Sequence, residues 1–256
     1  MKTTVKCPRC GFGSESGFAD CPKCGVIVGK YMEMKHSDKK IEDREFAARE
    51  SSLQNLAAAN ALVIRQRKEW GEIVSGFETK NTYDVMDHWK NPLFEAEEEG
   101  GSFGTIITRF LLTAMRPFTM HIFSIDGKGL LKLNRPFRFY FHELEVSKAN
   151  GAVVGTIKRR FSILRRHYSV RDRHGNEVYQ LFGPILHPWT FQIKKNGQEL
   201  GKITKKWGGL LKESMTDADN FGINFPPGIN LGQKALLLGA VFLIDFVHFE
   251  SRGGRN

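Results

Sequence analysis

The stretch KALLLGAVFLIDFVHF, residues 234–249, decides how the chain must fold. It is apolar on every face from Ala235 to Ile244, so a helix made of it must be surrounded on all sides by protein or by lipid. At 1.5 Å per residue the helix would be about 24 Å long, which is short of the roughly 30 Å hydrocarbon core of a bilayer. A carboxylate in lipid costs several kcal/mol, and Asp245 lies inside the stretch. We therefore expect a helix threaded through protein, with Leu238, Phe242 and Asp245 among its residues, rather than a transmembrane span.

The chain from Gly76 onward supplies the protein that would surround this helix. Short alternating runs are separated by turn sequences, and Asn-Gly or Asp-Gly between such runs is a strong hairpin signal. The turns fall at residues 90–92, 126–129, 149–151, 173–176, 195–197 and 226–228. Six hairpins imply about twelve antiparallel strands, and a sheet of that size must split or close because its edges would otherwise aggregate.

We therefore predict a mainly β fold, a closed twelve-stranded antiparallel barrel around the C-terminal helix. A barrel wider than about eight strands is not filled by its own side chains, so the helix would occupy the interior. Gly239 and Ala240 would let the surrounding strands approach the helix closely. Asp245 would be either a solvated charge at the end of the helix or the buried partner of a barrel Arg or Lys.

All four cysteines lie in the first 24 residues, as two C-x2-C pairs separated by ten residues. Each pair sits in a Cys-Pro-x-Cys-Gly turn, where the glycine permits positive φ and backbone N–H groups can point at the thiolates. Four thiolates at this spacing predict a tetrahedral Zn²⁺ site, with iron or a redox disulfide pair as the alternatives. The predicted ligands are Cys7, Cys10, Cys21 and Cys24. No position on the metal stays open, so we expect a structural ribbon whose folding depends on the metal.

Between the ribbon and the barrel, the composition shifts to charged residues and alanine, with no Gly or Pro from Tyr31 to Trp70. Apolar residues at loosely helical offsets predict a helix, or two helices broken near Ser51-Ser52, acting as a solvated spacer; a coiled-coil arm is the alternative. The expected organisation is a zinc ribbon over residues 1–30, a helical spacer over 31–72, a barrel domain over 73–251 and a disordered tail over 252–256.

The formal net charge of +10 is concentrated in one part of the barrel. Residues 134–212 hold 16 Lys and Arg against 5 Asp and Glu, whereas residues 76–133 hold 6 against 8. If neighbouring hairpins place these cations on one wall, anionic lipid would attract each of them by about 1 kcal/mol. A solvated basic surface and a nucleic-acid-binding face are the alternatives. The candidate lipid-binding residues are Lys158, Arg159, Arg160, Arg165, Arg166, Lys194, Lys195, Lys205 and Lys206.

Several segments resemble the phospholipid scramblase family in order and spacing. They include Leu133-Asn134-Arg135-Pro136-Phe137, residues 201–207, residues 216–226 and residues 238–246. The resemblance covers about Ile73 to Ser251. It implies a tubby-like barrel around a hydrophobic helix, and an activity that moves phospholipids in both directions between leaflets without ATP.

The resemblance also implies a Ca²⁺ segment of twelve residues that starts at Asp217. Asp217 and Asp219 keep carboxylates, but Phe221 and Ile223 offer no side-chain oxygen and the last position is Gly228. Because a Ca²⁺ loop needs six to eight oxygen ligands, we expect a weak calcium site at best. No Cys follows Cys24, so the palmitoylated cysteines of animal members have no counterpart in this sequence.

The sequence lacks the nucleotide-binding, zinc-protease and serine-hydrolase motifs G-x-x-x-x-G-K-[ST], G-x-G-x-x-G, H-E-x-x-H and G-x-S-x-G, so we predict non-covalent lipid handling rather than an enzyme. Residues 1–6 lead straight into the cysteine motif without an apolar segment, which predicts a cytoplasmic protein, peripheral at the inner face of the plasma membrane. The predicted function is a scramblase-family protein that interacts with anionic lipid. The alternatives are a soluble lipid-binding or adaptor module and a zinc-ribbon nucleic-acid-binding protein.

Overall fold

The computed structural model describes residues 5–15, 17–67, 81–99, 117–137, 142–162, 166–205 and 220–249, with the backbone alone over 38–50. The chain forms two compact units, Met1–Glu50 and Ser51–Asn256. The first contains a two-stranded sheet of β1 (Val5–Lys6) and β2 (Gly13–Ser14), followed by most of helix α1 (Val28–Ala58).

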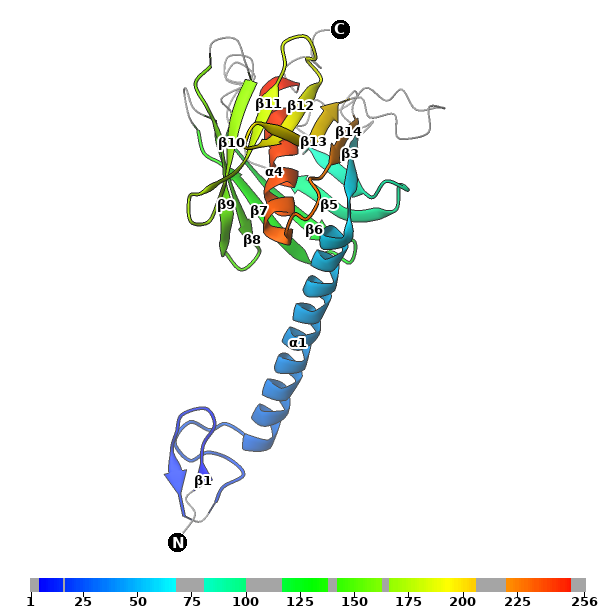
Figure 1. Ribbon diagram of the computed structural model, residues 1–256. Helices are drawn as coiled ribbons and strands as arrows, with labels where there is room; N and C mark the ends of the chain where they lie inside the picture. The colour runs from blue at the N-terminus through cyan, green and yellow to red at the C-terminus, as the bar shows by residue number, and fades with distance from the viewer. Residues whose placement is uncertain are drawn as a thin grey trace, which may run out of the picture. The chain divides into compact units, whose positions relative to one another are not determined.

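The second unit is a closed antiparallel barrel of twelve strands with helix α4 (Leu231–His248) inside it (Figure 1). The strands are β3 (Ala61–Arg67), β4 (Thr82–Met86), β5 (Pro92–Glu98), β6 (Phe118–Ser124), β7 (Gly129–Arg135), β8 (Glu143–Lys148), β9 (Val153–Arg159), β10 (Arg166–Asp172), β11 (Glu177–Gly183), β12 (Thr190–Lys195), β13 (Gln198–Lys205) and β14 (Asn220–Asn224). Strands adjacent in sequence are adjacent in the barrel, and β14 closes it by pairing with β3. The predicted mainly β barrel around a C-terminal helix is therefore confirmed.

Five of the six predicted hairpin turns connect paired strands; the sixth does not. Residues 226–228 lead from β14 into α4 instead. Pro226 and Pro227 lack the N–H group that a further strand would donate to its neighbour, so the chain leaves the sheet here.

Of the two alternatives for the predicted spacer over 31–72, the structure shows the single helix, but that helix ends well before residue 72. Helix α1 is one continuous helix through Ser51 and Ser52, and it ends at Ala58. Residues 61–67 form strand β3, in which Leu62 and Ile64 are buried two residues apart and face the barrel interior. The spacing of these two residues fits a strand better than a helix. Residues 250–256, which include the predicted tail, lie outside the described part of the chain.

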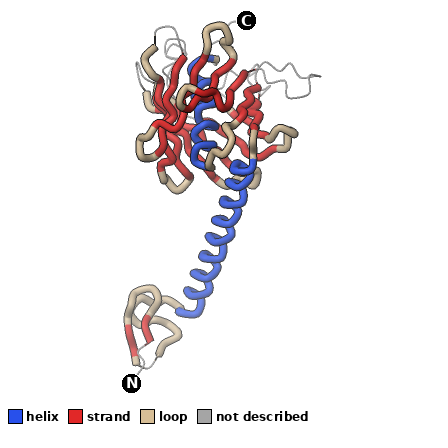
Figure 2. The backbone as a smooth tube through the Cα atoms, viewed as in Figure 1, coloured by secondary structure: helices blue, strands red, loops and turns tan. Residues whose placement is uncertain are grey.

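Helix α4 fills the barrel, and Figure 2 shows it enclosed by strands. It begins with a capping box, in which Asn230 Oδ1 accepts a hydrogen bond from the Gln233 N–H. Leu238 and Phe242 have no exposed surface, and Asp245 is 5% exposed. A Cβ at Gly239 would lie 2.8 Å from Val146 Cγ2, which confirms that this position needs a residue without a side chain. By length and composition α4 could cross a bilayer, but here 78% of it is buried in protein.

Candidate functional site

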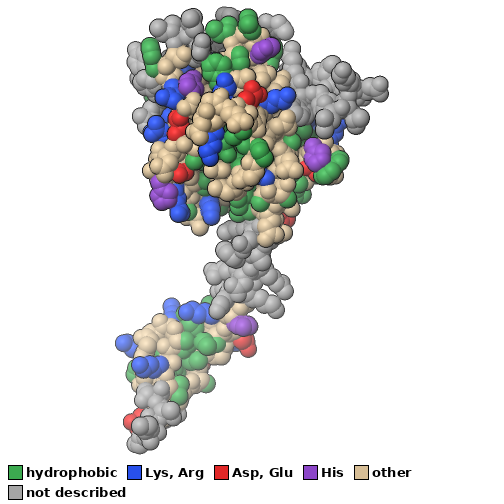
Figure 3. All heavy atoms as spheres, in the orientation of Figure 1, with side chains coloured by type: hydrophobic (Ala, Val, Ile, Leu, Met, Phe, Trp, Pro, Cys, Tyr) green, Lys and Arg blue, Asp and Glu red, His purple; other side chains and the backbone are tan. Residues whose placement is uncertain are grey.

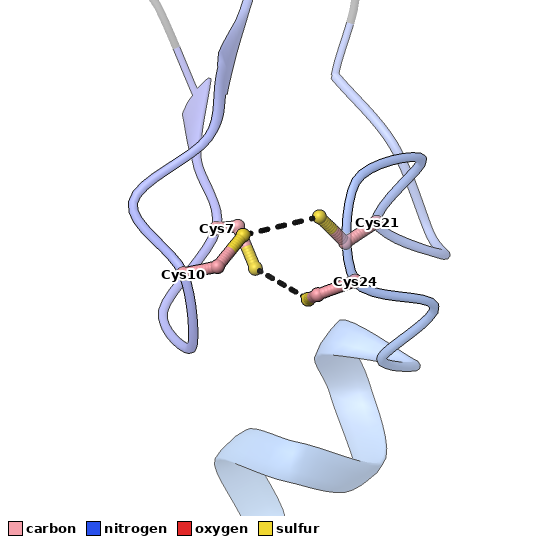
Figure 4. Close-up of side chains that lie close together, drawn as sticks. All are labelled: Cys7, Cys10, Cys21 and Cys24. Carbon is pink, nitrogen blue, oxygen red and sulfur yellow. Dashed lines mark hydrogen bonds between the residues drawn. The ribbon is translucent and has the colours of Figure 1, made fainter.

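The four cysteines of the first unit converge on one point, as Figure 4 shows. Their sulfur atoms all lie within 4.8 Å of one another, with Cys10 and Cys21 Sγ 3.6 Å apart and Cys7 and Cys24 Sγ 3.8 Å apart. A tetrahedron of sulfurs each about 2.3 Å from zinc has edges of about 3.8 Å. The side chains present therefore fit a four-thiolate metal site.

Two turns of the same geometry build this cluster. Gly11 N–H donates to the Cys7 carbonyl at 2.9 Å, and Gly25 N–H donates to the Cys21 carbonyl at 2.8 Å. Both glycines have positive φ, +74° and +67°, which a residue with a Cβ rarely adopts. The expectation that each trailing glycine closes a turn is confirmed.

The thiols of the cluster differ in acidity. Burial raises the pKa of Cys7, but the backbone N–H groups of Cys10 and Arg9 and hydrogen bonds from Cys21 and Cys10 outweigh it and lower the pKa to about 6. At Cys24 the Val26 N–H lowers the pKa, yet burial and hydrogen bonds shared with the other three thiols raise it to about 11. Four neighbouring thiolates repel one another, and a bound cation would remove that repulsion.

Inside the barrel, Asp245 of α4 is held by two barrel side chains. The Tyr83 hydroxyl donates to Asp245 Oδ2 at 3.0 Å, and Lys205 Nζ lies 3.6 Å from Oδ1. Of the two expectations for Asp245, the buried partner of a barrel cation is the one the structure shows. Lys205 is consequently not part of an exposed basic wall, and that prediction is wrong. Its side chain is 12% exposed and points inward, because it lies two residues after the buried Ile203 and so on the same face of β13.

A second buried polar pair joins Arg135 to His142. Arg135 Nη2 lies 2.6 Å from His142 Nδ1, and both residues are buried. Because a guanidinium can only donate, Nδ1 must be the acceptor and the imidazole must be neutral. Burial, then the charges of Arg135 and Arg159, lower the pKa of His142 to about 4. The two-residue period of β7 places Arg135 on the same inward face as Leu131 and Leu133, so the sequence indicates that Arg135 is buried. Nothing in the sequence identifies His142 as its partner.

The exposed cations gather over strands β9 to β13, on the outward face of the wall. One row across the sheet contains Glu143, Lys158, Ser169, Gln180 and Lys194, each paired with the next in register. The row beyond it contains His167, Phe182, Gln192 and Lys202, with Arg160 bonded through its backbone to His167. Figure 3 shows Lys and Arg side chains distributed over this domain.

Four of the nine predicted lipid-binding cations lie on this wall: Lys158, Arg160, Lys194 and Lys195. Arg166 instead donates to the carbonyl groups of Pro184, His187 and Pro188. Lys158 Nζ lies 2.9 Å from Glu143, and Arg160 Nη1 lies 3.5 Å from Glu177. Lys194 Nζ lies 4.6 Å from the centre of the Phe182 ring, and Lys195 is exposed. Arg159 follows the inward-facing Ile157 by two residues and is half-buried.

Four predicted site residues cannot be placed. Arg165, Lys206, Asp217 and Asp219 lie outside the described residues. Sequence reasoning missed Tyr83, whose hydroxyl contacts Asp245, because a strand tyrosine carries no signal of a polar partner 162 positions away.

Comparison with known proteins finds relatives over most of the chain. The family model described as Scramblase matches residues 43–251. Phospholipid scramblase 1 of Mus musculus is 32% identical over 218 residues, which are 80% of this chain and 65% of the mouse protein. The human protein of the same name is 31% identical over 80% of this chain and 67% of its own length. Phospholipid scramblase 2 of Bos taurus is 32% identical over 79% of this chain and 72% of the bovine protein.

The chain thus spans about two thirds of the length of the mammalian scramblase 1 proteins it matches. A solved structure of an Arabidopsis thaliana protein aligns with a TM-score of 0.42 and 11% identity over 75% of this chain and 95% of that one. The family match begins within α1, so the cysteine cluster lies before it. On the sequence match over most of its length, the chain belongs to the scramblase family.

Proposed function

We propose that this protein binds anionic phospholipid bilayers and moves phospholipids in both directions between leaflets, without ATP and without making or breaking a covalent bond. The observation that carries the proposal is the family match over residues 43–251, with relatives named phospholipid scramblases. The activity is non-covalent, so the protein would not be an enzyme in the chemical sense. We place it in the cytoplasm, peripheral at the inner face of the plasma membrane, because that leaflet carries the anionic lipid that attracts cations.

The outward wall of β9 to β13 supports attraction to such a membrane. Lys158 and Arg160 take part in exposed ion pairs, which contribute little and leave the cations accessible to other anions. Each cation near an anionic surface contributes about 1 kcal/mol, so a group of five or six is sufficient for peripheral binding. The binding should weaken as salt is added.

We further propose that the cysteine cluster holds Zn²⁺ as a structural ion. The sulfur spacing supports zinc, and four protein ligands leave no position for a substrate. The ion would stabilise a segment too small to fold on its own apolar core. The two carboxylates of Asp217 and Asp219 support at most a weak calcium site.

A second candidate function is a soluble lipid-binding or adaptor module without translocation. The observation that favours it is the position of α4, which is buried within a closed barrel. A helix in that position cannot span a bilayer unless the barrel opens, and opening would expose most of the core.

Reconstitution distinguishes the two candidates. The full chain is incorporated into vesicles that contain a fluorescent lipid, and an impermeant quencher is added with and without Ca²⁺. We expect the signal of the protected inner leaflet to decrease in vesicles that carry the protein. Flotation with vesicles but no loss of the protected signal would reduce the protein to a binder.

The contribution of the basic wall is tested by charge reversal. Lys194→Glu with Lys202→Glu should weaken flotation with vesicles containing phosphatidylserine by about tenfold or more, since the two cations become anions. The matched control is Lys128→Glu with Lys132→Glu, which makes the same charge change on β7 and the turn before it, five strands from β12 and six from β13 around the barrel. A mixed-sequence DNA duplex at equal salt provides the comparison for nucleic acid. Equal loss in both variants would indicate net charge alone, and tighter binding to the duplex would contradict lipid binding.

A further inference from the structure

One end of the barrel exposes large apolar side chains to water. Consecutive strands of the barrel are antiparallel, so successive connections between them lie at alternate ends of the barrel. The β9–β10 and β11–β12 connections both lie at the end where α4 finishes (Figure 1). In these connections Phe161 is 78% exposed, Ile185 is 62% exposed and Leu186 is 88% exposed. Figure 3 shows hydrophobic side chains on this upper end. We name Phe161, Ile185 and Leu186 the apolar rim.

The β11–β12 connection, which carries two of these residues, is held in place rather than loose. The Arg166 guanidinium donates to three of its carbonyl groups, at 2.6 Å to Pro188 and 3.3 Å to Pro184 and His187. The same guanidinium lies 4.5 Å from the centre of the Phe191 ring. Trp189, at the end of the connection, stacks on Phe249 with ring centres 5.3 Å apart. Ile185 and Leu186 are therefore held in water by a fixed loop, although transferring their side chains out of water would be favourable in free energy.

The charges next to the apolar rim are positive. The outward row that starts beside the β9–β10 connection contains Arg160 and Lys202 and no carboxylate among the residues described. Burial lowers the pKa of His167 in the same row below its usual 6.5, so this imidazole is neutral at pH 7. Carboxylates begin one row further from the rim, at Glu143 and Glu199. Lys202 and Arg160, which also lies 3.5 Å from Glu177, stand behind the exposed apolar tips. Cations in this position are complementary to a surface that is anionic outside and apolar beneath.

The opposite end of the barrel has charges of both signs beside its exposed apolar residues. Trp89 is 73% exposed and Ile125 is 53% exposed, and each sits in a tight turn. Asp87 precedes Trp89 by two positions and Asp126 directly follows Ile125. Lys90 directly follows Trp89, and Lys128 Nζ lies 3.1 Å from Asp126, so the cations at this end stand beside carboxylates. The two connections that carry the apolar rim contain no Asp or Glu.

We propose that the apolar rim inserts into the interfacial region of an anionic bilayer, so that the barrel docks on the membrane by the end at which α4 finishes. This inference rests on the proposed membrane function and names the part of the molecule that carries it. The basic wall would attract the protein to the surface, and Phe161, Ile185 and Leu186 would enter the headgroup layer. Docking by this end brings His248 and Phe249, at the end of α4, toward the lipid.

The test uses flotation of the full chain with vesicles of phosphatidylcholine containing a minority of phosphatidylserine. Ile185→Ser with Leu186→Ser should lower the partition coefficient by about tenfold or more, and Phe161→Ser should lower it further, because the apolar area that enters the lipid is lost. The matched control is Trp89→Ser with Ile125→Ser, which removes exposed apolar area at the other end and should leave binding unchanged. The rim defect should persist at high salt, since it does not depend on charge.

The outcomes separate the inference from the proposed function. If the wild-type chain floats and the rim variants float equally well, the rim inference is wrong and the proposed membrane binding stands. A wild-type chain that does not float would overturn both. If the rim variants change the oligomeric state of the protein in solution but not its flotation, the rim is a contact between copies of this chain, and the inference is wrong.

Discussion

At the scale of single residues, Asp245 and His142 show opposite ways of burying a titratable group. Asp245 is kept near a cation, because Lys205 lies 3.6 Å from one oxygen and Tyr83 donates to the other. His142 is kept neutral, because its Nδ1 accepts from Arg135. Removing water from a charge is costly unless a partner replaces it, so each group is tied to a specific neighbour.

The neutral state of His142 predicts a dependence of stability on pH. Its pKa is lowered from 6.5 to about 4 in the folded chain, so between these values the unfolded chain binds more protons and stability falls as the pH falls. At about pH 5 the loss amounts to about 2 kcal/mol relative to neutral pH. The measurement is urea unfolding of the wild-type chain and of His142→Gln, which keeps an acceptor but does not titrate. A variant that loses as much stability as the wild-type chain on acidification would contradict the assignment.

At the scale of elements, Gly239 marks the closest approach of α4 to the barrel. A methyl group at this position would lie 2.8 Å from Val146 Cγ2, and a β-branched side chain has little freedom to move away. We expect Gly239→Ala to destabilise the barrel by about 1–3 kcal/mol, despite the better helix propensity of alanine. Combining it with Val146→Ala should recover part of the loss. The comparison is a double-mutant cycle in urea, and simple additivity of the two losses would show that the contact is not limiting.

The cysteine turns behave as a separate element, which predicts what metal removal does. Chelation, or Cys7→Ser, should unfold the segment of residues 5–27 and leave the barrel folded, because the cluster and the barrel lie in different compact units. Proteolysis of the N-terminal segment with an unchanged thermal transition of the barrel is the expected result. Metal content measured on the purified chain should show one zinc per molecule. Cooperative loss of the whole fold would mean that the two units are not independent.

At the scale of the whole molecule, the closed barrel limits how lipid can be moved. Helix α4 is held inside by the Lys205–Asp245 pair near one end, and near the other by Lys234, whose Nζ donates to the Ala57 and Ala59 carbonyls at 2.5 and 2.6 Å. If translocation needs the helix to move, weakening these contacts should affect the rate of translocation more than membrane binding.

Lys205→Met tests this constraint. It removes the Lys205 ammonium from the buried Asp245, so we expect a loss of about 3 kcal/mol in the free energy of unfolding. In reconstituted vesicles it should increase the rate of lipid movement while flotation stays unchanged, since Lys205 faces inward. The control is Ser169→Ala, which removes a hydroxyl that donates to Glu177 on the outer face and does not contact α4. Equal rates in wild type and Lys205→Met would indicate that lipid moves without release of the helix.

Several features of the protein were determined by the sequence alone, because they depend on residues close together in the chain. Two Cys-Pro-x-Cys-Gly turns build the cysteine cluster, and five Gly-, Asn- or Asp-containing turns set the hairpins. A segment that is apolar on every face from Ala235 to Ile244 and is followed by Asp245 indicated a helix enclosed by protein. Each of these signals operates within a few residues, where backbone sterics and solvation decide the outcome.

Tertiary structure alone decided the features that depend on barrel closure. Residues 61–67, predicted as part of the helical spacer, form strand β3, because a closed twelve-stranded sheet has to pair its last strand with its first. It turned Lys205 inward to meet Asp245, and it brought Arg135 to His142. It also gathered Phe161, Ile185 and Leu186 at one end, although they lie in separate connections. The physical reason is that the register of each strand, and so the face to which each side chain points, depends on its pairing with both neighbours around the closed barrel. The partner of a buried side chain is therefore fixed only when all the strands are paired.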